Sequence, residues 1–73
     1  LTISPNPANN FIILTGVDKA ERVILYSITG QLLREWVHVN GNQQLNISDL
    51  QKGVYIIKVL HHNAETVHKI IKQ

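Results

Sequence analysis

The sequence predicts an all-β fold, an immunoglobulin-like antiparallel β-sandwich of about seven short strands. Short apolar runs alternate with turn-forming residues at intervals of about 8 to 12 residues, which is the spacing of strands in a sandwich. No segment shows the 3.6-residue apolar stripe of an amphipathic helix. Ile, Leu and Val dominate the apolar residues, whereas the aromatics are one Trp, two Tyr and one Phe. Branched aliphatic side chains favour strands, and 73 residues suit one small domain.

Four strands are expected in the first half of the chain, at residues 1–4, 10–15, 22–28 and 31–39. Pro5 and Pro7 end the first strand, because proline has no backbone N–H and biases the preceding residue to extended geometry. Gly16 ends the second strand, and Thr29-Gly30 turns the third into the fourth. Residues 17–21 are the one segment for which a short helix is an alternative.

Three further strands are expected in the second half, at residues 44–47, 53–61 and 67–72. Asn40-Gly41-Asn42 is the strongest turn signal in the chain, because Asn and Gly tolerate positive φ. A second turn is expected at residues 62–65, before the closing strand.

The alternation of apolar and polar residues predicts which side chains face the core. The expected inward residues are Val23, Leu25, Leu45, Ile47, Tyr55, Ile57 and Val59. Residues 11–14 and the pair Leu32-Leu33 resist this assignment, because they are apolar on both faces. For residues 11–14 two explanations are open: a central strand covered on both sides, or an exposed apolar patch that receives a partner.

Charge and composition exclude several classes of protein. The net charge is +2 and the seven Lys and Arg residues are spread along the chain, so no nucleic-acid-binding surface is expected. The longest apolar runs have about four residues, against the roughly 18 needed to span a bilayer as a helix, so no membrane insertion is expected. There is no cysteine, which leaves no disulfide and no thiolate chemistry.

No set of residues predicts catalysis. The acidic residues fall at expected turns or outward strand positions, where carboxylates are solvated; they are Asp18, Glu21, Glu35, Asp49 and Glu65. The serines lack the Gly-x-Ser-x-Gly elbow, and no glycine-rich phosphate loop occurs. We therefore expect no enzyme, no catalytic or cofactor-binding residue and no cofactor.

Histidine is the one suggestive cluster, with His61, His62 and His68 near an expected hairpin. Adjacent strand residues point to opposite faces, so a shared metal is hard to build, and surface histidines are the favoured interpretation. Trp36 allows either stacking on a sugar ring or packing in the core. Core packing is favoured, because sugar-binding modules usually present several aromatic residues and an indole is usually well buried.

Four short motifs follow one another along the chain. Leu50-Gln51-Lys52-Gly53-Val54-Tyr55 places a tight corner before a long strand, and the tyrosine hydroxyl can tie that corner down. Pro5-Asn6-Pro7 forms a rigid corner between the first two strands, because proline fixes φ and Asn makes local turns. The other two motifs are the turn Ser27-Ile28-Thr29-Gly30 and the closing strand Lys69-Ile70-Ile71-Lys72-Gln73.

In this order the motifs resemble the type A C-terminal sorting domain of the bacterial type IX (Por) secretion system, across essentially the whole chain. Ser27 stands where the family often has Asp or Asn, and Gln31 where Arg or Lys is common; both residues are polar and leave the turn intact. The resemblance implies a non-catalytic signal that directs an N-terminal cargo domain to the cell surface or the medium. It implies passage through the periplasm and the outer membrane, recognition by the translocon and its shuttle proteins, and removal by a sortase-like peptidase. Residues 1–73 are then expected to be a single sorting domain excised from a longer secreted protein.

The resemblance also points to individual residues. Those that match the family's motifs, and are expected to shape the fold, are Pro5, Asn6, Pro7, Gly30, Leu50, Gly53 and Tyr55. Those expected to contact the secretion machinery are Lys69, Ile70, Ile71, Lys72 and Gln73. In this closing strand we expect the apolar pair to serve packing and both lysines to stay solvated, with strand addition as one route of recognition. The alternative function is an immunoglobulin-like adhesion or carbohydrate-binding module appended to an extracellular enzyme.

Overall fold

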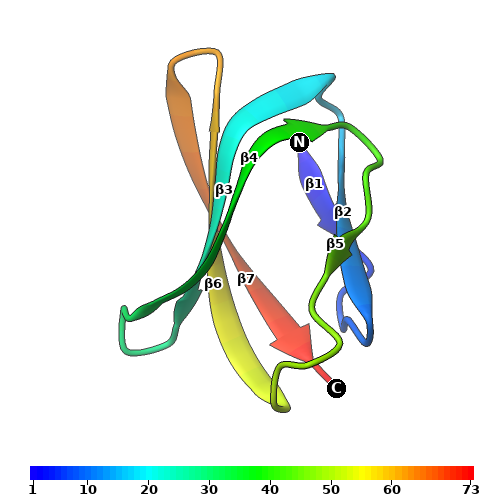
Figure 1. Ribbon diagram of the computed structural model, residues 1–73, viewed down its shortest axis with the longest axis vertical. Coiled ribbons are helices and arrows are strands. Elements are labelled where there is room, and N and C mark those ends of the chain that lie inside the picture. Colours follow the sequence, from blue (N-terminus) through cyan, green and yellow to red (C-terminus); the bar gives the residue numbers. More distant parts are fainter.

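The computed structural model describes all 73 residues and forms a sandwich of two antiparallel sheets. Its strands are β1 (Thr2–Ser4), β2 (Phe11–Thr15), β3 (Lys19–Ser27), β4 (Leu32–Asn40), β5 (Leu45–Asn46), β6 (Gly53–His61) and β7 (Ala64–Lys72). The smaller sheet has the order β1-β2-β5 and the larger has the order β4-β3-β6-β7. The two sheets lie face to face with the core between them (Figure 1). The predicted all-β sandwich and its seven strands are confirmed, and no helix that could cross a membrane is present.

Two expected boundaries are wrong, and each error has a local cause. Residues 17–21 form no helix, because β3 begins at Lys19, and Ala20 is buried opposite Val39 of β4. β7 begins at Ala64 because the connection from β6 has only two residues, His62 and Asn63, with φ of 51° and 60°. Positive φ at both central residues is the geometry of a type I′ hairpin, which matches the twist of the flanking strands. The other strand ends lie within one residue of their expected positions.

The core is built from aliphatic side chains of both sheets. Six of the residues predicted to face inward are fully buried, and Tyr55 packs against them half-buried. Ile12 and Leu14 of β2 also point into the core, whereas Phe11 and Ile13 on the other face are half-buried. β2 is therefore a central strand of its sheet with one face in the core and one face partly open.

The pair Leu32-Leu33 is exposed because the ladder between β3 and β4 is irregular there. Leu32 pairs with Tyr26 and Arg34 pairs with Leu25, which leaves Leu33 as an extra residue without a partner. Such a bulge interrupts the regular alternation of side chains. Both leucines remain open to solvent, at 52% and 39% exposure.

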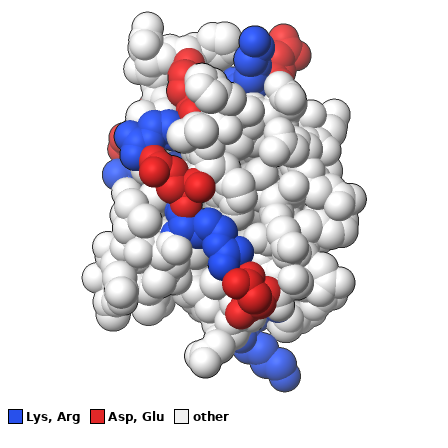
Figure 2. Space-filling view, viewed as in Figure 1, with Lys and Arg blue, Asp and Glu red and all other residues white.

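Charged side chains form a diagonal band in which acidic and basic groups alternate (Figure 2). Arg22 pairs with Glu35 across β3 and β4, and Lys58 lies 3.7 Å from Glu65 across β6 and β7. Exposed ion pairs of this kind typically contribute less than about 1 kcal/mol each to the free energy of unfolding. Glu35 and Glu65 are thus paired with basic groups at the surface.

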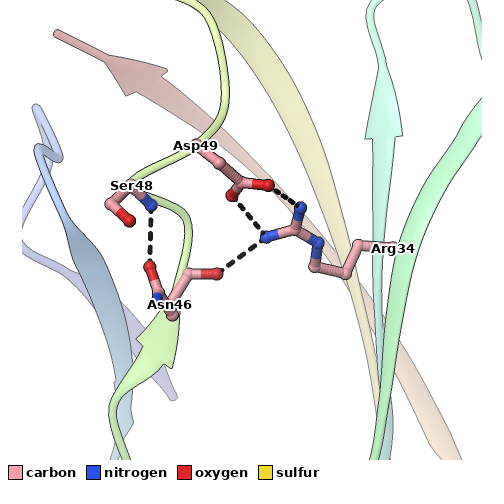
Figure 3. A network of polar contacts seen from close by, with 4 residues as sticks. All are labelled: Arg34, Asn46, Ser48 and Asp49. Carbon is pink, nitrogen blue, oxygen red and sulfur yellow. Dashed lines mark hydrogen bonds and ion pairs between the residues drawn. The ribbon is translucent and has the colours of Figure 1, made fainter.

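One ion pair joins the two halves of the sandwich. Arg34 of β4 donates to both carboxylate oxygens of Asp49, at 3.0 and 2.8 Å, and to the main-chain oxygen of Asn46 at 2.9 Å (Figure 3). Asp49 lies in the connection between β5 and β6, so the bidentate contact ties the edge of the larger sheet to the end of the smaller one. The Arg34 hydrogen bonds lower the pKa of Asp49, and the carboxylate raises the pKa of Arg34.

Gly41 in the turn after β4 is required by a close approach of two backbones. Its N–H donates to the carbonyl of Asp18 at 2.7 Å, and a Cβ at this position would collide with the carbonyl oxygen of Val17. Positive φ in this turn belongs to Asn42, at 65°, whereas Gly41 is needed for space.

We predict that Gly41→Ala lowers the free energy of unfolding by about 1–3 kcal/mol, because the methyl group forces the turn away from Val17. For a domain of this size, a loss of 1 kcal/mol corresponds to a fall in melting temperature of roughly 4–8 °C. Thermal denaturation followed by circular dichroism measures this change. Gln44→Ala, at an exposed position of the same loop, is the control and should melt like the parent. Equal melting temperatures for both variants would contradict the close approach.

Candidate functional site

The Pro5-Asn6-Pro7 corner and the closing strand lie together, although they stand at opposite ends of the chain. The corner connects β1 to β2. Its Asn6 side chain donates from Nδ2 to the carbonyl of Lys69 at 3.2 Å and accepts the N–H of Ile71 on Oδ1 at 3.0 Å. The amide group thus occupies the place that the backbone of a neighbouring strand would take.

Ala8 extends this contact to the end of the chain. Its N–H donates to the carbonyl of Ile71 at 2.7 Å, and its carbonyl accepts the N–H of Gln73 at 2.8 Å. Ala8 is fully buried and forms a parallel bridge with Lys72. Residues 6–8 therefore cover the free edge of β7 from Lys69 to its end at Lys72, and the contact continues to Gln73. A strand added at this part of the edge would have to displace the corner.

The side chains of the closing strand divide between the two faces of the sheet. Ile70 is fully buried and Lys72 is only 7% exposed, so both point inward, whereas Lys69 and Ile71 point outward. The expectation that both lysines are solvated is wrong for Lys72. Its cross-strand neighbour is Gly53, which has no side chain, so the lysine stem has room to pack inward. The Lys72 ammonium group donates to the main-chain oxygen of Gln73 at 3.0 Å.

The tyrosine corner is present in the structure. The Tyr55 hydroxyl donates to the carbonyl of Gln51 at 2.6 Å, which closes the loop that leads into β6. Leu50 packs against the core at the start of this loop, and Gly53 adopts a φ of 153°, which side chains rarely allow. Tyr55 also lies opposite Ile70, so the corner supports the closing strand from the other side.

The turn between β3 and β4 is closed by Ser27 and Gly30. The N–H of Gly30 donates to the carbonyl of Ser27 at 2.9 Å, and the Ser27 hydroxyl accepts the N–H of Gln31 at 3.1 Å. Gly30 has a φ of 94°, which favours glycine. A serine oxygen thus satisfies the turn's backbone donor at this position.

The histidines do not form a metal site. No group of three or more histidine or carboxylate side chains comes together in the structure. Nε2 of His68 lies 3.0 Å from the hydroxyl of Thr66, and burial lowers the pKa of His68, with smaller effects from the α-amino group of Leu1 and from His61. His62 is exposed at the hairpin tip, and His61 is half-buried, with its Nδ1 atom unpartnered.

The structure thus brings some of the predicted residues together and leaves others apart. Asn6 meets the strand from Lys69 to Gln73, and Tyr55 meets Ile70. Pro5 and Pro7 are exposed and only direct the chain around the corner, and Gly30 belongs to the separate β3–β4 hairpin. The sequence does not predict the backbone bonds from Ala8 to Ile71 and Gln73, because an alanine beside an Asn-Pro turn carries no signal for a partner at the other end of the chain.

One family model, described as the secretion system C-terminal sorting domain, matches residues 2–73. Neither the curated proteins nor the solved structures gave a match.

We predict that Tyr55→Phe lowers the free energy of unfolding by about 0.5–1.5 kcal/mol, because it removes the hydrogen bond to Gln51 and leaves the ring in place. Chemical denaturation with urea measures the difference. Tyr26→Phe is the matched control, because its ring contacts the Lys58 ammonium group and that contact survives without a hydroxyl. If the Tyr55 and Tyr26 variants unfold at the same urea concentration, the corner bond contributes nothing.

We predict that Asn6→Ala lowers the free energy of unfolding by about 1–3 kcal/mol, because two hydrogen bonds to the edge of β7 are lost. Hydrogen exchange at the Ile71 amide should accelerate at the same time, because this N–H loses its acceptor. Asn6→Asp keeps an acceptor for Ile71 but loses the donor to Lys69, so its effect should be smaller. Asn9→Ala, an exposed neighbour, is the control. Unchanged exchange at Ile71 in Asn6→Ala would show that the side chain does not hold the strand.

Proposed function

This chain belongs to the family of secretion system C-terminal sorting domains, and from that premise we propose that the secretion machinery reads it as a folded sandwich rather than as a linear peptide. Domains of this family are sorting signals for type IX secretion, which direct export to the cell surface or the medium. A sorting signal is not itself a catalyst. In agreement with this role, Glu35, Asp49 and Glu65 are engaged in separate ion pairs and do not converge on one site.

The observation that carries this proposal is the contact between the corner and the closing strand. Asn6 and Ala8 bond the backbone of residues 69–73, so the closing strand, which pairs with β6 along one edge, is held along its other edge only when the first residues of the domain are folded beside it. A receptor that reads Lys69 or Ile71 therefore depends on the whole sandwich. The matching motifs at both ends of the chain support one structural signal instead of two independent peptides.

In this proposal the partners are the outer-membrane translocon and its shuttle proteins, which meet the domain after its passage through the periplasm. The cargo precedes residue 1, and a sortase-like peptidase separates it from the domain. Pro5, Asn6, Pro7, Gly30, Leu50, Gly53 and Tyr55 act by shaping the fold. Lys69 and Ile71 are the members of the closing strand that offer side chains to a partner, because Ile70 and Lys72 are buried.

The carbohydrate-binding alternative loses its candidate residue in the structure. Trp36 lies opposite Val23 and packs against the core, so its ring is not displayed for stacking on a sugar. No other feature of the molecule favours an adhesion module.

We predict that residues 1–73, fused behind a periplasm-directed fluorescent protein in a type IX-competent bacterium, send the reporter to the surface or the medium. A fusion that carries only residues 64–73 should stay in the periplasm, because the isolated strand lacks the corner and the sheet that orient it. Cell fractionation and fluorescence of the medium measure the outcome. The reporter without any added segment is the control. Retention of the complete fusion would contradict the sorting role in this chain, and export of the short fusion would contradict the folded signal.

A further inference from the structure

The outward face of the larger sheet is apolar at one end, where no other part of the chain covers it. We call this region the outer patch, and it consists of Tyr26, Ile28, Leu32, Val54, Ile56 and Ile71. The strand registers place five of these residues side by side, and Ile28, in the turn after β3, lines the same surface depression as Tyr26 and Ile56. Leu32, Tyr26, Ile56 and Lys69 form one row across β4, β3, β6 and β7, and Val54 with Ile71 begins the next.

Three of the six side chains of the outer patch are exposed: Ile28 at 69%, Leu32 at 52% and Ile71 at 41%. Tyr26, Val54 and Ile56 are half-buried. A shallow depression of about 290 Å³ lies on this face, lined by Tyr26, Ser27, Ile28, Gly30, Ile56 and Lys58. Contiguous exposed apolar surface on a small soluble domain marks an interaction site.

Lys69 is the one charged residue in the two rows of the outer patch. It ends the row that contains Tyr26 and Ile56, and it has no acidic partner in the structure. The next row along the strands contains Glu35, Ile24, Lys58 and Val67, and the Lys58 ammonium group lies 5.4 Å from the centre of the Tyr26 ring. Glu35 is paired with Arg22 and Lys58 with Glu65, so Lys69 is the basic group at the patch whose charge is unmatched.

We propose that the outer patch is the docking surface for a protein of the secretion machinery whose contact face is apolar and edged with carboxylates. This inference rests on the proposed function and names the surface through which it acts. A carboxylate of the partner would form an ion pair with Lys69, the one basic group at the patch that lacks a partner. Apolar side chains of the partner would fill the depression beside Ile28.

Two other occupants fit the outer patch less well. A second copy of the domain would place two such patches face to face, and neither patch contains a carboxylate for the Lys69 of the other. An anionic lipid surface is bound by clusters of several basic residues, and Lys69 stands alone beside the patch. A protein with its own carboxylates matches both the apolar centre and the single lysine.

The corner described above supports the β7 side of this surface. The pairing of β7 with β6 directs the Lys69 and Ile71 side chains outward, and Asn6 and Ala8 hold the other edge of the same backbone. The β7 side of the outer patch is therefore fixed on both edges in the closed sandwich, in agreement with a signal that is read in the folded state.

The test uses the complete reporter fusion with single substitutions that place a carboxylate in the outer patch. Ile28→Glu and Ile71→Glu should each lower the exported fraction of the reporter roughly tenfold, because they put a negative charge against an acidic partner in an apolar contact. Val37→Glu is the matched control, because this valine is exposed, at 57%, on the same face and two rows away from the patch. It should be exported within about twofold of the parent, as surface changes away from the contact have small effects. Lys69→Glu should reduce export of the reporter, whereas Lys69→Arg, which keeps the positive charge, should be exported like the parent.

Folding of each purified variant is checked by its melting curve, and Ile28→Glu carries the test if Ile71→Glu does not fold, because Ile28 lies in a turn. Export of folded patch variants at the level of the Val37→Glu control would overturn the docking surface and leave the sorting function in place. An equal loss in patch and control variants would overturn it as well. Failure of the parent fusion to leave the periplasm would instead refute the sorting function itself.

Two measurements in solution separate the other occupants. Size-exclusion chromatography with light scattering should show a monomer for the parent. A dimer that Ile71→Glu abolishes would contradict the proposal and show that the outer patch binds a second copy of the domain. Flotation with vesicles of phosphatidylethanolamine and phosphatidylglycerol should leave the parent unbound. Vesicle binding that Ile71→Glu abolishes would contradict the proposal and show that the outer patch binds a lipid surface.

Discussion

Closure of the edge of β7 by the first turn of the chain is the contact on which the remaining architecture depends. An edge strand presents unpaired backbone groups, and a small sandwich must cover them or remain open to unwanted pairing. Here the Asn6 side chain and the Ala8 backbone supply the missing partners for residues 69–73. The same contact buries Ala8, while the pairing of β7 with β6 sets which side chains of β7 point inward and which point outward. The core, the covered edge and the outer patch therefore meet at β7.

The other open side of the sandwich is closed by chemistry of a different kind. Arg34 reaches from β4 to Asp49 and to the carbonyl of Asn46. The hydrogen bonds of its guanidinium group stand in place of the backbone hydrogen bonds that a continuous barrel would have. Asp49 is solvent-exposed, and a contact of this kind is screened by salt. The two sides of the domain thus differ: one is held by a backbone ladder and the other by an ion pair.

Much of the fold follows from local rules, and the parts that do not are those that depend on distant partners. Alternation within β3, β5 and β6 correctly predicts that Val23, Leu45 and Ile57 are buried, because the side-chain period of a strand is a property of a few consecutive residues. The bond from Asn6 to Lys69 joins residues 63 positions apart, and no pattern near either residue announces it. The prediction that Lys72 is solvated is wrong for a related reason: its burial depends on the absence of a side chain at Gly53, its neighbour on another strand. Alternation does not predict the exposure of Leu33, because the bulge is a property of the pairing of two strands rather than of one strand.

The pairing of residues 6–8 with residues 69–73 also has a consequence for the order in which the molecule is made. The ribosome releases the corner early and its partner strand last, so the sandwich cannot close until translation has passed Gln73. A chain that stops before β7 leaves the Ala8 N–H and the Asn6 amide without their acceptors and donors, and exposes the core at Tyr55 and Ile57, which β7 covers. Closure of the domain is therefore a record that all of residues 1–73 have been synthesised, and any process that acts only on the closed form excludes products truncated within the domain.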